Sequence, residues 1–210
     1  MKTSHLVSGM LVLLLCASGV AKAQSGQGEI GVTLFGGFFK ATANQVELDL
    51  GQINGEDQQL TAKHEGAPLF GLRVNGWLNS NVGLETAASF TQSGFKGEAF
   101  GEEGTIRASL FYSSLKIMLS TGGPVRLNIG GGFGLVTSSY NDPSLDGNTH
   151  MTGVLSAGLN LPLAPNIAIN LGFEDHIHSV FWDLGNGVET PELTQHDLLF
   201  SAGLCLFRSN

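Results

Sequence analysis

The sequence has few cysteines, and their positions argue against a disulfide-stabilised fold. The 210 residues include only Cys16 and Cys205. Cys16 lies in an apolar N-terminal stretch with the features of a cleaved export signal, so the remaining chain would carry one thiol and no internal disulfide. An exported domain without a disulfide has to be stabilised by other interactions.

No apolar run in the chain is long enough for a transmembrane helix, and the longest run lies at the start. Lys2 precedes an apolar stretch that ends in Ala21-Lys22-Ala23, a small-x-small cleavage pattern. The apolar stretch falls short of the roughly 20 residues that a spanning helix needs. We therefore predict a signal peptide over residues 1–23 and a single domain over residues 24–210.

Positive charge is also scarce. Lysine and arginine total 10 against 18 acidic residues, and two of the lysines belong to the predicted signal peptide. Nucleic acid is therefore excluded as a partner, because its phosphates are neutralised by clustered lysine and arginine.

Helical periodicity is missing after the signal, and alternation with a period of two takes its place. In each alternating segment one face is apolar, and the other is polar or glycine. In the segment 106–119 we assign Phe111, Leu115, Ile117 and Leu119 to the apolar face. The final segment is apolar on both faces, so its orientation stays open. The eight segments are 29–39, 69–78, 82–91, 106–119, 125–136, 151–161, 167–178 and 196–207.

The glycine-rich stretch 125–136, VRLNIGGGFGLV, is one of these segments rather than a phosphate-binding loop. A phosphate loop needs a strand before the glycines and a helix after them. Here Leu127, Ile129 and Phe133 alternate with Arg126 and with glycines. Glycine on a strand marks a bend or leaves room for a bulky neighbour.

The connections between segments alternate in length. Short joins at 79–81, 120–124 and 162–166 alternate with long polar joins at 40–66, 92–104, 138–149 and 182–195, which hold 13 of the acidic residues. This pattern is typical of a barrel that crosses a membrane with short turns on one side and loops on the other. We predict an all-β, eight-stranded antiparallel up-and-down transmembrane β-barrel. The first long join alternates around Asn54-Gly55, which favours a hairpin that extends the barrel.

Three stretches carry a resemblance to a known family: EIGVTLFGGFF at the first strand, PVRLNIGGGFGLV in the middle and LFSAGLCLF near the end. The chain resembles the small eight-stranded outer-membrane barrels of the OmpX and OmpA membrane-domain type. The resemblance implies a monomer in the outer membrane of a Gram-negative bacterium. Its implied partners are outer-membrane lipids, lipopolysaccharide and the barrel-assembly machinery.

Charged residues of both signs fall on the inward faces of the predicted strands. Because an unpaired buried charge is costly, these residues should form a plug of ion pairs, with Arg126 close to Glu85 or Glu174. A gated ion path is the alternative. The predicted lumen charge cluster comprises Arg73, Glu85, Lys116, Arg126 and Glu174.

The stretch FEDHIHSVFWD carries the remaining candidate chemistry. Glu174, His176 and His178 share a face and could bind a metal ion, but we expect the histidines to be hydrogen-bonded lumen filler, without metal or cofactor. Some eight-stranded outer-membrane barrels are lipid A deacylases with a His-x-Ser arrangement. Here His178 and Ser179 are adjacent, so on a strand they point to opposite faces. Phe181-Trp182 are expected in an outer aromatic girdle.

The sequence favours a structural or surface-interaction role without catalysis. A narrow channel for small solutes or ions is the second hypothesis, and a lipid A-modifying enzyme is the third. The acidic long joins would form a solvated rim that meets divalent cations, or a surface for a basic partner.

Overall fold

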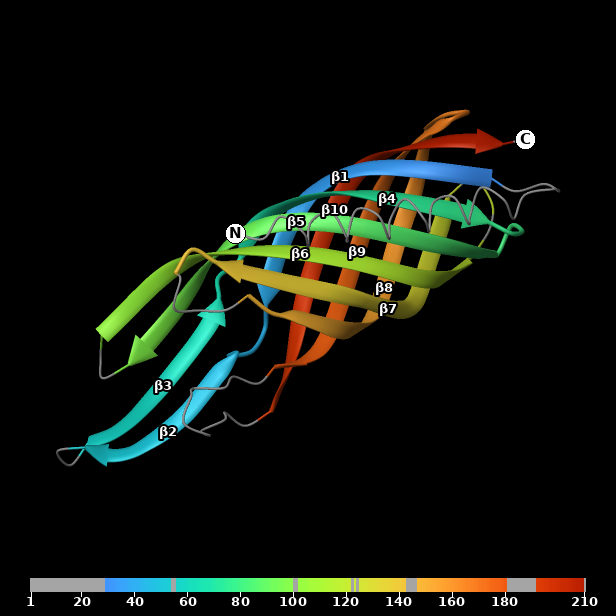
Figure 1. Ribbon diagram of the computed structural model, residues 1–210. Coiled ribbons are helices and arrows are strands. Elements are labelled where there is room, and N and C mark those ends of the chain that lie inside the picture. The colour runs from blue at the N-terminus through green and yellow to red at the C-terminus, as the bar shows by residue number, and fades with distance from the viewer. Residues whose placement is uncertain are drawn as a thin grey trace.

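The computed structural model describes residues 29–53, 56–99, 102–121, 123, 125–142, 147–180 and 192–209, and these residues form ten antiparallel strands (Figure 1). No helix in these ranges is long and apolar enough to cross a membrane. The strands are β1 (Glu29–Ala41), β2 (Val46–Ile53), β3 (Glu56–His64), β4 (Ala67–Trp77), β5 (Val82–Ala99), β6 (Glu102–Ser120), β7 (Arg126–Tyr140), β8 (Thr149–Ala164), β9 (Ile167–Val180) and β10 (Leu193–Ser209).

Eight of these strands close into a ring. Their order is β5-β4-β1-β10-β9-β8-β7-β6, and pairing of β6 with β5 completes the circuit. Each strand thus has a partner on both sides, which removes the exposed edges that a membrane would not tolerate. The predicted eight-stranded antiparallel barrel is confirmed, and each of the eight predicted segments lies on one of its strands except for the end residues Leu78 and Val125.

The other two strands, β2 and β3, form a hairpin that projects beyond one end of the barrel (Figure 1). The hairpin pairs Ile53 with Glu56, which confirms the expected extension around residues 54–55. The hairpin joins the barrel because Thr61–His64 of β3 pair with Phe95–Glu98 of β5. These residues of β5 follow the stretch that pairs with β4. Residues 42–45 and 65–66 separate the hairpin strands from β1 and β4.

The prediction of a long loop at 92–104 was wrong. Strands β5 and β6 pair from Val82↔Leu119 to Ala99↔Glu102, so both continue beyond the barrel as a second extended hairpin. The polar residues there suggested a loop, but Phe95 and Ala108 face inward and pack with Val46 and Ala62. Strands β2, β3, β5 and β6 thus form a four-stranded outer sheet, with its own small core.

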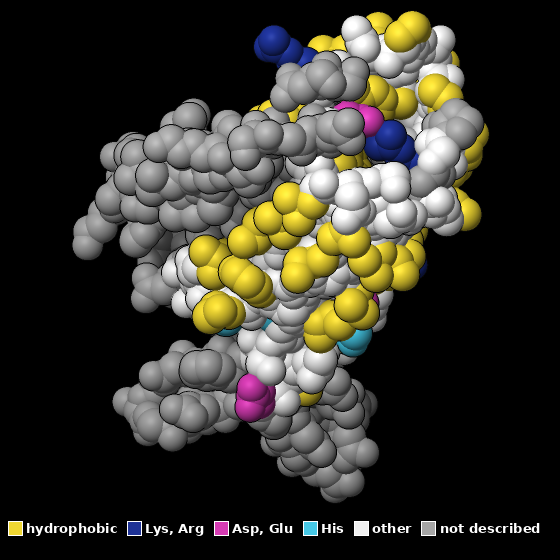
Figure 2. Space-filling view, turned by 90° about the vertical axis from the view of Figure 1, so that its right-hand side faces the viewer, with side chains coloured by type: hydrophobic (Ala, Val, Ile, Leu, Met, Phe, Trp, Pro, Cys, Tyr) yellow, Lys and Arg dark blue, Asp and Glu magenta, His cyan; other side chains and the backbone are white. Residues whose placement is uncertain are grey.

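The outer wall of the barrel is apolar. Outward side chains such as Leu34 (68% exposed), Phe70 (63%) and Met151 (75%) would be anomalous in water. Figure 2 shows hydrophobic side chains spread over the described wall that faces the viewer, with backbone and other side chains between them. This exposure is what a lipid-facing band requires. The structure also orients β10, with Phe200, Leu204 and Leu206 outward and Leu199 and Cys205 buried inside.

The glycines of β7 leave space for side chains inside the barrel and for the backbone of the neighbouring strand β6. A Cβ on Gly132 would collide with the carbonyl oxygen of Leu115, and a Cβ on Gly134 with that of Ser113. A Cβ on Gly130 would meet the side chains of Met118 and Ser156. By contrast, Gly131 faces outward and has ordinary clearance. The glycine run therefore permits close approach, as the strand interpretation of this stretch expects.

Candidate functional site

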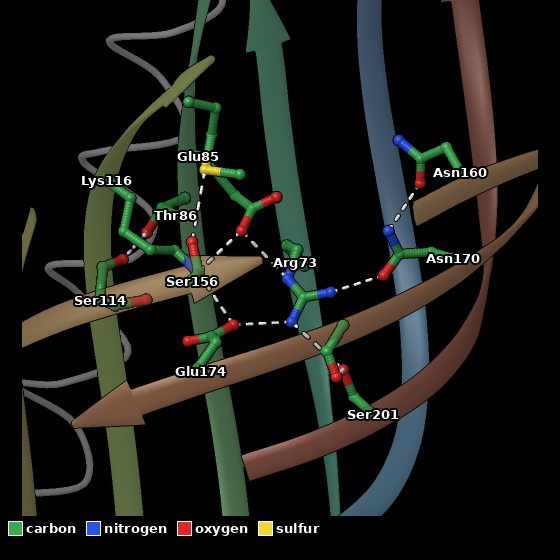
Figure 3. A network of polar contacts seen from close by, with 12 residues as sticks. Arg73, Glu85, Thr86, Ser114, Lys116, Ser156, Asn160, Asn170, Glu174 and Ser201 are labelled. Carbon is green, nitrogen blue, oxygen red and sulfur yellow. Dashed lines mark hydrogen bonds and ion pairs between the residues drawn. The ribbon is translucent and has the colours of Figure 1, made fainter. Parts of the chain in front are cut away.

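The interior is the part of the molecule in which polar residues from distant strands converge. Four buried side chains form a continuous charge cluster near the middle of the barrel (Figure 3). Glu85 Oε1 lies 3.1 Å from Arg73 Nε and 2.8 Å from Lys116 Nζ. Glu174 Oε1 lies 2.6 Å from Arg73 Nη2 and 2.9 Å from Lys116 Nζ. Each cation contacts both carboxylates, and the two positive charges balance the two negative charges. We call Arg73, Glu85, Lys116 and Glu174 the lumen charge cluster.

Neutral polar groups and one aromatic ring complete the surroundings of Arg73. Its Nη1 donates to Asn170 Oδ1 at 2.6 Å, and Asn170 Nδ2 donates to Asn160 Oδ1 at 2.6 Å. Its Nη2 also lies 3.4 Å from Ser201 Oγ, and the guanidinium carbon lies 4.7 Å from the centre of the Phe35 ring. These contacts hold the guanidinium in one orientation, which favours a rigid plug.

Arg126 does not belong to this cluster. It pairs with Glu29 through two hydrogen bonds of 2.8 Å at the short-turn end of the barrel, and its guanidinium carbon lies 5.7 Å from the Trp77 ring centre. The expectation that Arg126 lies close to Glu85 or Glu174 was wrong. Alternation gives the face of the strand correctly, but Arg126 is the first residue of β7, and depth along the barrel depends on strand tilt.

An apolar layer lies beside the charge cluster and packs across the lumen. Tyr112 and Phe39 are fully buried at its centre, with ring centroids 5.8 Å apart. Side chains from β1, β4, β6, β7 and β10 meet there, so the layer closes the barrel from several sides. We call this group the lumen apolar layer; it comprises Phe35, Phe39, Ala67, Leu69, Leu110, Tyr112, Val136 and Leu199.

Beyond this layer, towards the outer sheet, lies a small recess lined by polar side chains. Tyr112 donates to Asp197 Oδ2 at 3.0 Å, and His178 Nε2 lies 3.9 Å from the same oxygen. His178 stacks on His150, with ring centroids 5.7 Å apart. Leu110 and Val136 of the apolar layer also line the recess. Sequence reasoning did not single out Asp197, because the orientation of β10 was open, and it gave no role to Tyr112 of β6.

The two predicted lumen histidines lie in different surroundings. His176 is within 3.4 Å of Glu174 Oε2 and 3.2 Å of Thr152 Oγ1, whereas His178 belongs to the recess. Within the described ranges, no three His, Cys, Asp or Glu side chains are placed to hold a metal ion. His178 is buried and Ser179 is exposed, on opposite sides of β9. The predicted girdle residues Phe181-Trp182 lie outside the described residues.

Comparisons with known proteins agree with this geometry. A family model described as "Outer membrane protein beta-barrel domain" matches residues 9–204. The solved structure of OprG from Pseudomonas aeruginosa is similar at 10% identity, with 88% of this chain and 97% of that chain covered and a TM-score of 0.64.

Two further structures of outer-membrane and surface proteins are similar at low identity. AlkL, solved in lipid bilayers, has 17% identity, 89% and 94% coverage and a TM-score of 0.56. Neisserial surface protein A has 13% identity, 84% and 96% coverage and a TM-score of 0.52. At these identities the likeness concerns the fold alone. The comparison with curated proteins found no match.

Proposed function

Because the chain belongs to the outer membrane protein beta-barrel domain family, we propose that it is a non-conducting, non-catalytic barrel that anchors a surface-exposed β-sheet. The observation that carries this proposal is the filled interior, in which the lumen charge cluster and the lumen apolar layer lie one beyond the other. Eight strands enclose a lumen that side chains can fill.

The energetics of the interior support a plug rather than an ion path. A mobile ion would have to displace Lys116 or Arg73 from two carboxylates at once, in a space that water barely enters. Breaking a buried pair leaves an uncompensated charge, at a cost of about 3–5 kcal/mol. The ion would then meet the apolar layer, where the rings of Tyr112 and Phe39 pack 5.8 Å apart.

The outer sheet supports the surface-interaction part of the proposal. In barrels of this class the short turns face the periplasm and the longer connections face outward. By that rule the β2–β3 hairpin and the ends of β5 and β6 stand outside the cell (Figure 1). Strands ordered on that side would present a fixed surface to a partner outside the cell.

Conductance across a planar bilayer tests the plug. The purified barrel should give no stable current steps above the bare bilayer at high potassium chloride. The Lys116→Met variant should remain silent as well, because Phe39 and Tyr112 still close the lumen. Stable steps whose size changes in Lys116→Met would contradict the proposal and support the channel hypothesis.

Mass spectrometry of lipid A tests the absence of catalysis. Lipid A from cells with and without the protein should have the same acyl and phosphate composition. A mass change that disappears in a His196→Gln variant would overturn the non-catalytic assignment. His196 is the informative position because its partly exposed ring bonds Asp175 on the outward face, with Nδ1 2.9 Å from Asp175 Oδ2.

A further inference from the structure

Asp197 is a buried carboxylate that forms no salt bridge with a lysine or arginine among the described residues. Its side chain is 1% exposed and lines the small recess beyond the lumen apolar layer. Asp197 Oδ2 accepts a hydrogen bond from the Tyr112 hydroxyl at 3.0 Å, and Oδ1 accepts one from Gln195 Nε2 at 3.4 Å. Both donors are neutral. By contrast, Glu85 and Glu174 each contact two cations in the lumen charge cluster.

His178 is the titratable side chain that faces Asp197 across the recess, and its ring does not complete the site. Nε2 lies 3.9 Å from Asp197 Oδ2, which is beyond hydrogen-bond distance, and Nδ1 has no hydrogen-bond partner in the protein. A neutral imidazole has one acceptor nitrogen, so this acceptor is free in either tautomer. Buried charges are normally paired, and buried acceptors are normally hydrogen-bonded. The recess therefore lacks one positive charge and one hydrogen-bond donor.

The shape of the recess limits what could supply them. It is partly open and has room for about one group of the size of a water molecule. The rings of His150 and His178 stack 5.7 Å apart at its wall, and Tyr140 also lines it. Faces of aromatic rings attract cations. The described side chains are not placed to hold a metal ion, so the cation that fits is one that donates hydrogen bonds.

From this geometry we propose that the recess binds an ammonium group, either as the free ion or as the end of a primary amine. The positive charge pairs with the Asp197 carboxylate, and an N–H donates to the free nitrogen of His178. A remaining N–H, or the carbon chain of an amine, points to the open side. His150 and Asn148 line that side and are partly exposed. The site lies on the outward side of the apolar layer, so it does not depend on whether the lumen conducts.

Titration of the folded protein with ammonium chloride in zwitterionic micelles tests the proposal. Ammonium chloride replaces sodium chloride at constant ionic strength and pH 8, and NMR follows the imidazole signals of His178. We expect a saturable shift. A hydrogen bond to a charged group is strong enough for Asp197→Asn to weaken binding roughly ten- to a hundredfold. Asp175→Asn is the matched control, because it removes an outward carboxylate that bonds His196, and it should leave the affinity unchanged. Equal weakening in both variants would overturn the proposal.

The size of the cation separates a built site from general attraction to negative charge. Methylammonium should shift the same signals, because its methyl group can point to the open side. Tetramethylammonium should not, because it is larger than the recess and has no N–H. A shift of equal size with tetramethylammonium, or no saturable shift with ammonium, would overturn the proposal. This series uses the unaltered protein, so it decides the question even where Asp197→Asn does not fold.

A linear diamine distinguishes the two sources of the ammonium group. Tighter binding of the diamine than of ammonium would identify the end of an amine as the ligand, because the chain then adds contacts at the open side. Equal or weaker binding would identify the free ion. Either result supports the site, whereas a diamine shift that survives in Asp197→Asn would contradict it.

Discussion

Two adjacent glycines of β7 have opposite tolerance for a side chain. A methyl group at Gly132 would collide with the backbone of β6, which cannot move away as a flexible side chain can. We expect Gly132→Ala to lower the free energy of unfolding by about 1–3 kcal/mol. Gly131→Ala is the matched control, since its methyl group would point outward with normal clearance, and its effect should stay within about 1 kcal/mol. Urea unfolding in lipid vesicles measures both, and equal losses would contradict the close-approach explanation.

Two arginines of the interior differ in what they hold together. Arg73→Ala leaves Glu85 and Glu174 with Lys116 as the one lysine or arginine that contacts them among the described residues, so we expect a loss of about 3–5 kcal/mol in the free energy of unfolding. Arg126→Ala breaks a partly exposed pair with Glu29 and should cost less than about 1 kcal/mol. The comparison uses equilibrium urea unfolding of both variants in the same lipid. A larger loss for Arg126→Ala would mean that the assigned positions along the barrel are wrong.

At the scale of single residues, alternation along a strand predicts which face a side chain lies on better than it predicts its height along the barrel axis. It placed Arg73, Glu85, Lys116 and Glu174 on inward faces, and the structure brings these four together. It could not separate Arg126 from them, because the height of a residue depends on the tilt and stagger of neighbouring strands. Those quantities arise when the barrel closes.

At the scale of elements, β3 carries a pH-sensitive contact outside the spanning part of the barrel. His64 is buried against Phe95 and Tyr140, and burial, with a smaller contribution from His178, lowers its pKa from 6.5 to about 4. The unfolded state therefore binds more protons between pH 6.5 and pH 4. The stability of the packed neutral ring is present above pH 6.5 and is lost progressively as pH falls towards 4.

The outer sheet should therefore be less stable in mild acid than at neutral pH. Between pH 7 and pH 5 we expect the lowered pKa of His64 to reduce the free energy of unfolding of the β2–β3 hairpin by about 2 kcal/mol. Trypsin cleavage after Lys63 in the folded protein measures local opening and should accelerate at pH 5 after correction for the activity of the enzyme. The His64→Gln variant should show a much weaker pH dependence. A pH response that is the same in both proteins would assign the effect to another group.

The sequence pattern could not predict where β5 and β6 end or which face of β10 lies inward, because both depend on contacts between segments far apart in the chain. Strands β5 and β6 continue past residue 91 because Phe95 and Ala108 find partners on the hairpin, a contact between segments far apart in the chain. In β10, His196 and Asp197 give both faces a polar residue, and the following leucines make both faces apolar. Only pairing with β1 and β9 decides that Asp197 faces the lumen.

At the scale of the whole molecule, the barrel and the outer sheet share β5 and β6 but differ in how they are held. Closure of the ring uses β1 and β4 directly, from Phe39↔Ala67 to Glu29↔Trp77, so it does not require β2 or β3. The outer sheet, by contrast, depends on the hairpin to cover Phe95. The barrel should therefore fold without its hairpin, at the expense of the outer sheet.

Replacing residues 43–65 with a tight turn tests this division. A closed barrel resists detergent, so the unboiled variant should still migrate differently from the boiled one on a denaturing gel, as the intact protein should. The ends of β5 and β6 beyond Phe95 should become sensitive to protease, because β3 no longer pairs with Phe95–Glu98. Phe95→Ser in the shortened chain is a control for solubility, since it removes the newly exposed ring. If unboiled and boiled samples migrate alike for the shortened chain both with and without Phe95→Ser, the hairpin is needed for barrel closure. The barrel and the outer sheet would then fold as a single unit.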